Sequence, residues 1–276
     1  MIEGRNAVIE ALRAGVAIDK VFIAKGETDS ALSYIASTAR GSGAVVVEAD
    51  RRKLDSMSET HSHQGVIALA ACTEYVTVGH ILDIAGQRGE EPHIVVCDGI
   101  TDPHNLGAII RTCEAAGVHG VVIPKRRSAG LSATVAKTSS GAVYHMAIAR
   151  VTNLASSIEE LKGAGVWVFG VSTDGKEPLW GRDLTGPAAF VIGSEGAGIS
   201  RLVSQKCDLS VRIPMYGKIS SLNASVSAAL VVYEAARQRA AISTLRTQST
   251  NKKQENLVRK VRTENSELRT EGTEDT

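Results

Sequence analysis

Short apolar runs alternate with segments of helical period along the first quarter of the chain. The pattern predicts a helix of small residues near 4–15, a strand at 21–24, a helix at 30–40, and strands at 44–49 and 65–71. Helices and strands that follow one another in this way pack as layers around one core. We therefore expect a compact α/β domain over residues 1–73.

A second and longer series of strands and helices begins after residue 92. The apolar runs predict strands at 93–99, 120–124, 144–151, 166–172, 188–193 and 209–214, and the segments between and after them predict helices at 106–117, 131–139, 154–165, 200–206 and 223–240. Strands that alternate with helices indicate a parallel sheet covered on both faces. The predicted fold class is α/β, with this second domain at 92–241.

Two further segments separate or follow these domains. Residues 74–91 are polar, contain glycine and end in a charged run before Pro92, so we expect a flexible linker there. Residues 242–276 lose the apolar period while they keep both charge signs. Such a segment has too little apolar surface to form a core, and we expect a charged tail that is disordered or partly helical.

Composition narrows the class of protein. The 276 residues are 43% hydrophobic, and no apolar run reaches the roughly 18 residues that span a bilayer. The opening residues have neither the basic start nor the apolar stretch of a signal peptide. We therefore expect a cytoplasmic protein with no membrane segment. The four cysteines form no CxxC pair, so we expect them to be reduced and structural.

Charge is close to balanced along the chain. The net charge of +1 gives no global pointer to nucleic acid. Two local clusters are basic, "RRK" at 51–53 and "KRR" at 125–127. Each is either a solvated surface patch or a set of phosphate contacts, and charge alone leaves both interpretations open.

Three junctions that follow predicted strands carry most of the candidate chemistry, because ligands of parallel α/β sheets collect at the carboxyl ends of strands. The first junction is "DGITDPHNLGAIIRT" at 98–112. Asn105 is predicted to cap the helix at its N-terminus, where free amides favour an anion such as phosphate. Arg111 lies about two helical turns further along. An ordinary cap and a surface charge are the alternatives for these two residues.

The second junction is "VIGSEGAGIS" at 191–200, where Gly193, Gly196 and Gly198 bracket Glu195. The spacing G-x-x-G-x-G differs from the dinucleotide fingerprint, and no acidic residue closes a strand about 20 residues later. A NAD site is therefore disfavoured. The glycines still allow the backbone to approach a flat ligand closely or to make a tight turn.

The third junction is "IPMYGKISSLNASVSAAL" at 213–230. Its loop carries Lys218, Ser220, Ser221 and Asn223 between a strand that ends in proline and a helix of small residues. The "GKIS" sequence is like the end of a phosphate-binding P-loop, but Arg212 stands where that loop needs a glycine. The P-loop is thereby excluded, and the polar side chains are free to hold another ligand.

Other enzyme motifs are missing from the sequence. The chain has no G-x-S-x-G and no H-E-x-x-H motif. His61 and His63 in "HSHQG" have no neighbouring Cys or carboxylate in the sequence that would complete a metal site. We expect no metal, and a structural or RNA-facing role for these two histidines.

The three junctions resemble, in the same order, the three motifs of the SpoU (TrmH-type) branch of the SPOUT RNA methyltransferases. The matching sequences are "NLGAIIRT", "VIGSEGAGIS" and "IPMYGKISSLNASVSAAL". "GRNAVIEAL" and "HQGVIA" are also similar to the amino-terminal substrate-binding domain of the RlmB-like members, so the resemblance covers residues 1 to 240. The charged tail has no counterpart in that pattern.

The resemblance implies a fold, a cofactor and an assembly. It implies an L30e-like domain that binds RNA at 1–73, a SPOUT α/β-knot catalytic domain with a deep trefoil knot at 92–241, and a homodimer. Members of the family bind S-adenosylmethionine in a bent shape against the main chain of the second and third motifs. Carried over by position, the cofactor-binding residues are Gly193, Ile213, Leu222, Thr173 and Met215.

The resemblance also implies the catalytic residues. The family assigns activation of the ribose 2′-hydroxyl to the motif-one arginine, which is Arg111 in this sequence, oriented by Glu195 and near Asn105, Ser221 and Asn223. A guanidinium keeps its proton to about pH 12 and is a poor base. Stabilisation of the developing alkoxide, or a bidentate bond to the 3′-phosphate, is the alternative role for Arg111.

The expected substrate is a guanosine ribose of 23S ribosomal RNA, as in the RlmB-like members. Under this interpretation the two basic clusters contact RNA phosphates, and the flexible linker lets the first domain find the RNA fold while the second delivers the methyl group. Three alternatives share the same motifs. They are a transfer RNA ribose methyltransferase, an antibiotic-resistance methyltransferase that acts on the ribosome, and a non-catalytic RNA-binding protein on the same fold.

Overall fold

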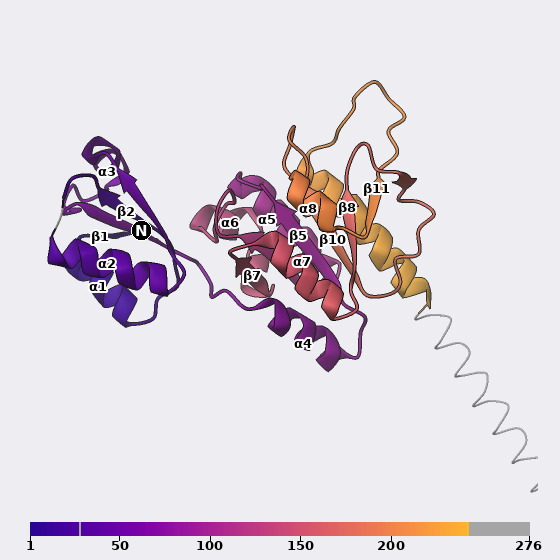
Figure 1. The fold of residues 1–276 in the computed structure, drawn as a ribbon, viewed down its shortest axis with the longest axis horizontal. Helices are drawn as coiled ribbons and strands as arrows, with labels where there is room; N and C mark the ends of the chain where they lie inside the picture. Colours follow the sequence, from indigo (N-terminus) through magenta and orange to yellow (C-terminus); the bar gives the residue numbers. More distant parts are fainter. Residues whose placement is uncertain (28, 243–276) are drawn as a thin grey trace, which may run out of the picture.

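The computed structural model describes residues 1–27 and 29–242 and contains two α/β units, each built on its own sheet (Figure 1). The first sheet has four strands in the order β1-β4-β2-β3, and the second has seven in the order β7-β6-β5-β10-β8-β11-β9. Residues 243–276 of the predicted charged tail lie outside the described residues.

The first unit follows the predicted alternation closely. Its elements are β1 (Ile2–Glu3), α1 (Arg5–Arg13), β2 (Ile18–Ala24), α2 (Ser30–Gly41), β3 (Val45–Ala49), α3 (Arg51–Met57) and β4 (Val66–Ala70). Helix α2 begins where the Asp29 side chain accepts a hydrogen bond from the amide of Leu32 at 2.8 Å. The two helices α1 and α2 bury Val8 and Ile35 against the sheet. Helix α3 was not predicted from the sequence, because it buries only Leu54 and shows no apolar period.

The second sheet is parallel throughout, as predicted. Its strands are β5 (His93–Asp98), β6 (Gly120–Pro124), β7 (Ile148–Val151), β8 (Trp167–Val171), β9 (Glu177–Pro178), β10 (Ala188–Gly193) and β11 (Leu209–Arg212). The strand predicted at 144–151 begins only at Ile148, because Ala142–Tyr144 forms a 3-10 turn (η1).

Helices cover both faces of this sheet. The helices are α5 (Pro103–Ala115), α6 (Ala133–Thr138), α7 (Leu154–Gly163), α8 (Arg201–Lys206) and a C-terminal helix whose described part is 224–242. On one face α5 and the C-terminal helix bury residues such as Ile110 and Val232, and on the other face α7 and α8 bury Ile158 and Val203. Each face therefore has its own apolar core.

The segment predicted to be a flexible linker contains a helix, α4 (Val78–Arg88). The hydroxyl of Thr77 caps its first turn by accepting a hydrogen bond from the amide of His80 at 3.1 Å. Val78, Ile81 and Ala85 are buried in the core that α7 also covers. Gly79 and Asp83 interrupt their helical spacing in the sequence, and glycines and charged residues follow at 86–91, so the pattern resembles that of a linker.

Strand order brings the three sequence junctions to one edge of the sheet. Strand β10 lies between β5 and β8, with Gly193 opposite Asp98 and Ile192 opposite Val171. Because the strands are parallel, the segments that follow β5, β8 and β10 leave the sheet side by side. The segment that follows β11 leaves from the same edge, since β11 pairs in parallel with β8.

Candidate active site

A cavity of about 350 Å³ lies at the carboxyl ends of β8 and β10. All five predicted cofactor-binding residues line it, and so do two of the predicted catalytic residues: Gly193, Ile213, Leu222, Thr173, Met215, Glu195 and Ser221. Segments that follow three different strands therefore supply its walls. The cavity is of the size that commonly holds a small molecule or cofactor.

The loop after β10 needs its glycines. A Cβ atom at Gly193 would lie 2.2 Å from the carbonyl carbon of Gly198, so no larger residue fits at position 193. Gly196 and Gly198 have φ of 81° and 64°, in the left-handed region that favours glycine. Two backbone hydrogen bonds between Ser194 and Gly198, of 3.1 and 2.9 Å, close the turn. The tight turn and the close backbone approach are thus both present in this loop.

The loop after β8 is held in place by β11. Arg212 donates from Nη1 to the carbonyl oxygens of Gly175 and Lys176, at 2.8 and 3.0 Å. A Cβ atom at Gly175 would lie 2.4 Å from the backbone of Val211, so this loop packs directly on the strand. Thr173 is thereby presented to the cavity from a fixed backbone.

A polar cluster joins the three sequence junctions beside the cavity. The Glu195 carboxylate accepts hydrogen bonds from the side-chain amides of Asn105, at 3.2 Å, and Asn223. The Asn223 amide also donates to Oδ1 of Asn105 at 3.0 Å, and the backbone amide of Ala224 lies 3.4 Å from the carboxylate. One carboxylate and two amides thus tie together segments up to 118 residues apart.

The cap of α5 differs from the prediction. Asn105 does not cap α5, because Asp102 accepts the hydrogen bond from the amide of His104 at 2.9 Å and Pro103 occupies the first helical position. The C-terminal helix is capped by Asn223, whose side chain accepts a hydrogen bond from the amide of Ser225 at 2.9 Å. Asn105 is the third residue of α5, and its side-chain amide donates to Glu195.

Arg111 lies on α5 and is exposed. Within the described residues it takes part in no hydrogen bond or ion pair, and the predicted orientation by Glu195 is absent, since that carboxylate is bonded to the two asparagines. An unpaired guanidinium is available to an anionic group such as an RNA phosphate. The role of Arg111 stays a prediction.

Several lining residues were missed by sequence reasoning. The added polar groups are hydroxyls of Ser172, Ser194 and Ser227, and Ala224 is the buried small residue beside them. All of them are within a few residues of a predicted motif position. For Ala224 and Ser227 the signal is the run of small residues in "SSLNASVSAAL", which leaves room for a ligand where a helix begins, and for Ser172 and Ser194 it is their place directly after an apolar strand.

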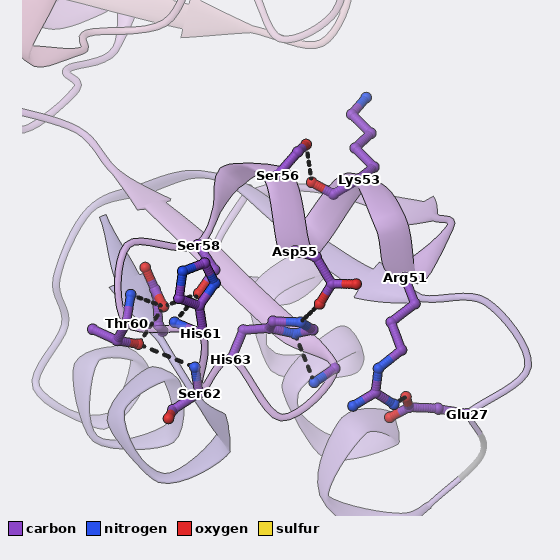
Figure 2. Close-up of polar contacts among 12 residues, drawn as sticks. Glu27, Arg51, Lys53, Asp55, Ser56, Ser58, Thr60, His61, Ser62 and His63 are labelled. Carbon is purple, nitrogen blue, oxygen red and sulfur yellow. Dashed lines mark hydrogen bonds and ion pairs between the residues drawn. The ribbon is translucent and has the colours of Figure 1, made fainter.

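The basic residues at 51–53 are exposed on the first unit. Figure 2 shows Arg51 and Lys53 of this cluster together with His61 and His63. Arg51 pairs with Glu27 at 2.7 Å, whereas the Lys53 side chain extends away from both. His63 is buried, bonded to Asp55 at 2.9 Å and to the amide of Gly65 at 3.0 Å, so its role is structural. His61, unlike His63, is exposed.

The loop that carries His61 is organised by Glu3. Its carboxylate accepts hydrogen bonds from the hydroxyls of Ser58 and Thr60, both at 2.6 Å, and from the amide of Glu59 at 2.8 Å. These bonds, the Ser58 hydroxyl first, lower the pKa of Glu3 to about 2. His61 has a φ of 56°, so the loop holds it in the left-handed region.

Metal and membrane chemistry find no support in the described residues. Across residues 1–27 and 29–242, no group of three His, Cys, Asp or Glu side chains is placed to hold a metal ion. Among the helices of that same part of the chain, none has the length and apolar character to cross a membrane.

Comparison with known families assigns both units. The sequence profile of the SpoU rRNA methylase family matches residues 92–233, which is the unit with the cavity. A second profile, described as RNA 2′-O ribose methyltransferase substrate binding, matches residues 1–76. The two matches fall on the two sheets.

Individual relatives extend over both units. YacO of Bacillus subtilis, assigned to the TrmH family of tRNA/rRNA methyltransferases, is 44% identical over 236 residues, which cover 86% of this chain and 94% of YacO. A solved structure with a similar fold is that of the SpoU methyltransferase AviRb of Streptomyces viridochromogenes in complex with S-adenosylmethionine. It is 25% identical with a TM-score of 0.56, and the alignment covers 87% of this chain and 90% of the AviRb chain.

A third relative, an rRNA methyltransferase from Sinorhizobium meliloti solved with S-adenosylmethionine bound, is 26% identical with a TM-score of 0.54 and covers 85% of each chain. The parallel sheet, the order of the three motifs and these similarities agree. They establish the α/β-knot fold and the cofactor, S-adenosylmethionine. The chain belongs to the SpoU (TrmH) family of S-adenosylmethionine-dependent RNA methyltransferases.

Proposed function

We propose that this protein methylates the ribose 2′-hydroxyl of a guanosine in large-subunit ribosomal RNA, as a homodimer in the cytoplasm. The observation that carries the proposal is the cluster of Glu195, Asn105 and Asn223 beside the glycine-lined cavity. It joins all three family motifs at one point, with the cofactor cavity on one side and the free guanidinium of Arg111 on the same helix as Asn105.

The cavity fits S-adenosylmethionine by its walls. The main chain at Gly193, Ile213 and Leu222 would hold the cofactor, with Thr173 and Met215 as neighbours. Gly193 itself has no side chain, and a Cβ atom there would clash with the backbone of Gly198, so the loop keeps its shape only with glycine at this position. When bound, the cofactor supplies a methyl group on a positively charged sulfur.

Methyl transfer to oxygen removes charge from the reacting atoms. The bond between the 2′-oxygen and the methyl carbon forms while the bond between sulfur and that carbon breaks, and the hydroxyl proton is released. The sulfonium becomes a neutral thioether, so a pocket of backbone and small residues suits the reaction without a metal. In-line placement of the hydroxyl is then the main contribution of the protein.

Arg111 is the group that we assign to the reacting ribose. Its guanidinium is exposed and unpaired within the described residues, so it can donate two parallel hydrogen bonds to the 3′-phosphate or stabilise the developing alkoxide. Oε1 of Glu195 accepts from the side-chain amides of both Asn105 and Asn223 and so holds these two residues in place. Ser221 lines the cavity beside them and offers a hydroxyl to the ribose.

The first unit supports ribosomal RNA over transfer RNA as the substrate. The Sinorhizobium meliloti rRNA methyltransferase aligns over 85% of this chain, which requires both units. The profile matched by the second unit is also that of an rRNA methylase family. An additional RNA-binding unit suits a large folded RNA, in which the target must be found among many similar nucleotides.

An exposed apolar surface on the C-terminal helix supports the homodimer. Val226, Leu230 and Tyr233 are 45%, 36% and 51% exposed, and Trp180 lies beside them at 43%. Ala108 and Thr112 of α5 continue this surface, which puts it next to Arg111. A second copy of the chain would bury the same patch on both subunits around a twofold axis.

The substrate is tested by incubation of the purified protein with tritiated S-adenosylmethionine and separate pools of unmodified ribosomal and transfer RNA. Nucleoside analysis then identifies the labelled product, and we expect 2′-O-methylguanosine from large-subunit RNA. Label in transfer RNA alone would keep the chemistry and overturn the substrate. An absence of label in both pools, with cofactor still bound, would favour a non-catalytic RNA-binding protein.

A further inference from the structure

A buried arginine of the catalytic unit reaches into the first unit. Arg150 lies on β7, which is the edge strand of the seven-stranded sheet. Its Nη1 donates to the carboxylate of Asp19 at 2.5 Å, and its Nη2 donates to the carbonyl oxygens of Ile18 and Gly43 at 3.2 and 3.0 Å. The side chains of Arg150 and Asp19 are only 8% and 10% exposed. All three partners of the guanidinium belong to the first unit.

Tyr75, which lies between the two units, completes this contact. Its hydroxyl donates to the Asp19 carboxylate and accepts from the amide of Leu131 in the catalytic unit at 3.1 Å. The Arg150 guanidinium lies over the tyrosine ring, 4.2 Å from its centre. Asp19, Tyr75 and Arg150 therefore form one hydrogen-bonded group, which we call the hinge cluster, with members from the first unit, the connection and the catalytic unit.

The packing around the hinge cluster leaves little freedom. A Cβ atom at Gly130 would lie 2.2 Å from the Asp19 carboxylate, so the backbone of the catalytic unit presses directly on that side chain. Another contact between the units follows at Lys125, whose Nζ would lie 3.1 Å from a Cβ atom at Gly43. Two strands of the catalytic sheet, β6 and β7, thus meet the first unit where they end.

The connecting backbone is bonded on both sides as well. The amide of Ala71 donates to Ala17 in the first unit at 2.8 Å, and the amide of Cys72 donates to Leu131 in the catalytic unit at 2.6 Å. Val76 then donates to Ile148 at 2.9 Å. A chain that is bonded to both units along its length cannot act as a free swivel.

We propose that Arg150 is a positioning residue that fixes the RNA-binding unit in one orientation on the catalytic sheet. Its planar guanidinium bonds a carboxylate and two carbonyl oxygens in different directions, which a point charge such as lysine cannot do. The distance between the RNA that the first unit grips and the cavity that delivers the methyl group is then set by the hinge cluster. This inference rests on the proposed function, and it replaces a flexible linker with a fixed spacing.

The test compares Arg150→Met and Arg150→Lys with the wild type in the full-length protein. Hydrogen exchange followed by mass spectrometry should show faster exchange at residues 71–76 and 130–131 in Arg150→Met, while the cores of both sheets keep their protection. With unmodified large-subunit RNA as substrate, kcat/KM should fall on the order of 100-fold, because two RNA contacts that are no longer held at a fixed spacing lose most of their joint affinity. The loss should lie mainly in KM for RNA, with unchanged affinity for S-adenosylmethionine, and Arg150→Lys should restore it only in part.

Arg5→Met is the matched control for the exchange measurement. Arg5 also bonds two carboxylates, those of Glu27 and Asp29, but both lie inside the first unit. Its loss should leave exchange at 71–76 and 130–131 unchanged. The proposal is overturned if Arg150→Met exchanges like the wild type there, or if its KM for RNA equals that of the wild type. A wild-type protein that methylates no RNA would instead refute the proposed function, and the exchange result would still decide whether Arg150 fixes the units.

Discussion

Polar side chains at the site divide between those already bonded and those left free. Glu195 is held by Asn105 and Asn223, so its charge is balanced by amide dipoles and not by a cation. Arg111 has no partner within the described part of the chain. We therefore expect Arg111 to contact the RNA, and we expect Glu195 and the two asparagines to fix the shape of the site around it.

Replacement of Arg111 by alanine should separate binding from chemistry. We expect kcat to fall on the order of 100-fold or more, as when a donor to a developing oxyanion is removed. The Kd for S-adenosylmethionine should stay within about twofold, because Arg111 does not line the cavity and contributes no main-chain contact there. Calorimetric titration and single-turnover methylation measure the two quantities, with the exposed Arg88→Ala as control. Retained turnover in Arg111→Ala would refute its assignment.

Glu3 provides a pH-dependent contribution to the stability of the first unit. Its pKa is about 2 in the folded protein, below the usual value of 4.5, because the carboxylate accepts hydrogen bonds from Ser58, Thr60 and Glu59. A lowered pKa means that the folded state favours the charged form. The stabilisation is therefore complete above about pH 4.5 and is lost as the pH falls toward 2.

The variant Glu3→Gln tests this contribution. It should unfold at lower urea concentration than the wild type at pH 7, since a neutral amide cannot accept the same set of bonds as strongly. The difference between the two midpoints should shrink when the pH is lowered from 5 to 3. A difference that stays constant over that range would show that the Glu3 carboxylate has an ordinary pKa.

Helix packing near the site depends on one glycine of α5. A Cβ atom at Gly107 would lie 1.9 Å from Oγ1 of Thr138 and 3.0 Å from the backbone amide of Ser139, both at the end of α6. Gly107→Ala should therefore push α5 and α6 apart and lower the free energy of unfolding by about 1–3 kcal/mol. Because Asn105 is on the same helix, the affinity for RNA should fall as well.

The same substitution in α4 should act in the opposite direction. Nothing lies within 4 Å of a Cβ atom at Gly86, which is exposed in the helix and has an ordinary negative φ. Gly86→Ala should raise the free energy of unfolding by about 0.5–1 kcal/mol through helix propensity alone. Urea denaturation of the two variants in parallel checks both signs, and equal effects would show that packing at Gly107 is looser than described.

Elements with a strong apolar period could be predicted from the sequence, and elements that depend on distant partners could not. Strands such as Ala188–Gly193 are continuous apolar runs, so their position and parallel pairing followed from the pattern. Helix α4 was hidden because Gly79 and Asp83 interrupt its period, yet burial of Ile81 stabilises it. Asp102 and not Asn105 caps α5, because either residue type can cap and only the backbone decides between them.

The candidate site shows the same division. The motif positions around the cavity could be named from the sequence because a family resemblance orders them along the chain. The bond between Asn105 and Asn223 spans 118 residues, and the pair of Asp19 and Arg150 spans 131. No local pattern signals contacts of this kind, because they exist only after the two sheets have formed and packed.

For the molecule as a whole, one buried contact and one exposed surface matter most for the proposed function. The hinge cluster sets the first unit against the catalytic sheet, and the apolar patch of the C-terminal helix faces outward. Val226→Glu should dissociate the homodimer that we propose, at concentrations where we expect the wild type to be dimeric, because an unpaired carboxylate would be buried at the twofold contact. Sedimentation velocity measures this, with Ser156→Glu on the exposed face of α7 as control. A dimeric Val226→Glu would place the subunit contact elsewhere.

We propose that the cavity and Arg111 act together in the methylation of one ribose of large-subunit RNA. The most direct measurement is mass spectrometry of nuclease fragments from unmodified ribosomal RNA after incubation with S-adenosylmethionine and either the wild type or Arg111→Ala. Under this proposal we expect one fragment that gains a methyl group on a guanosine ribose with the wild type, and none with the variant. Methylation on a base, or the same methylated fragment from both proteins, would contradict it.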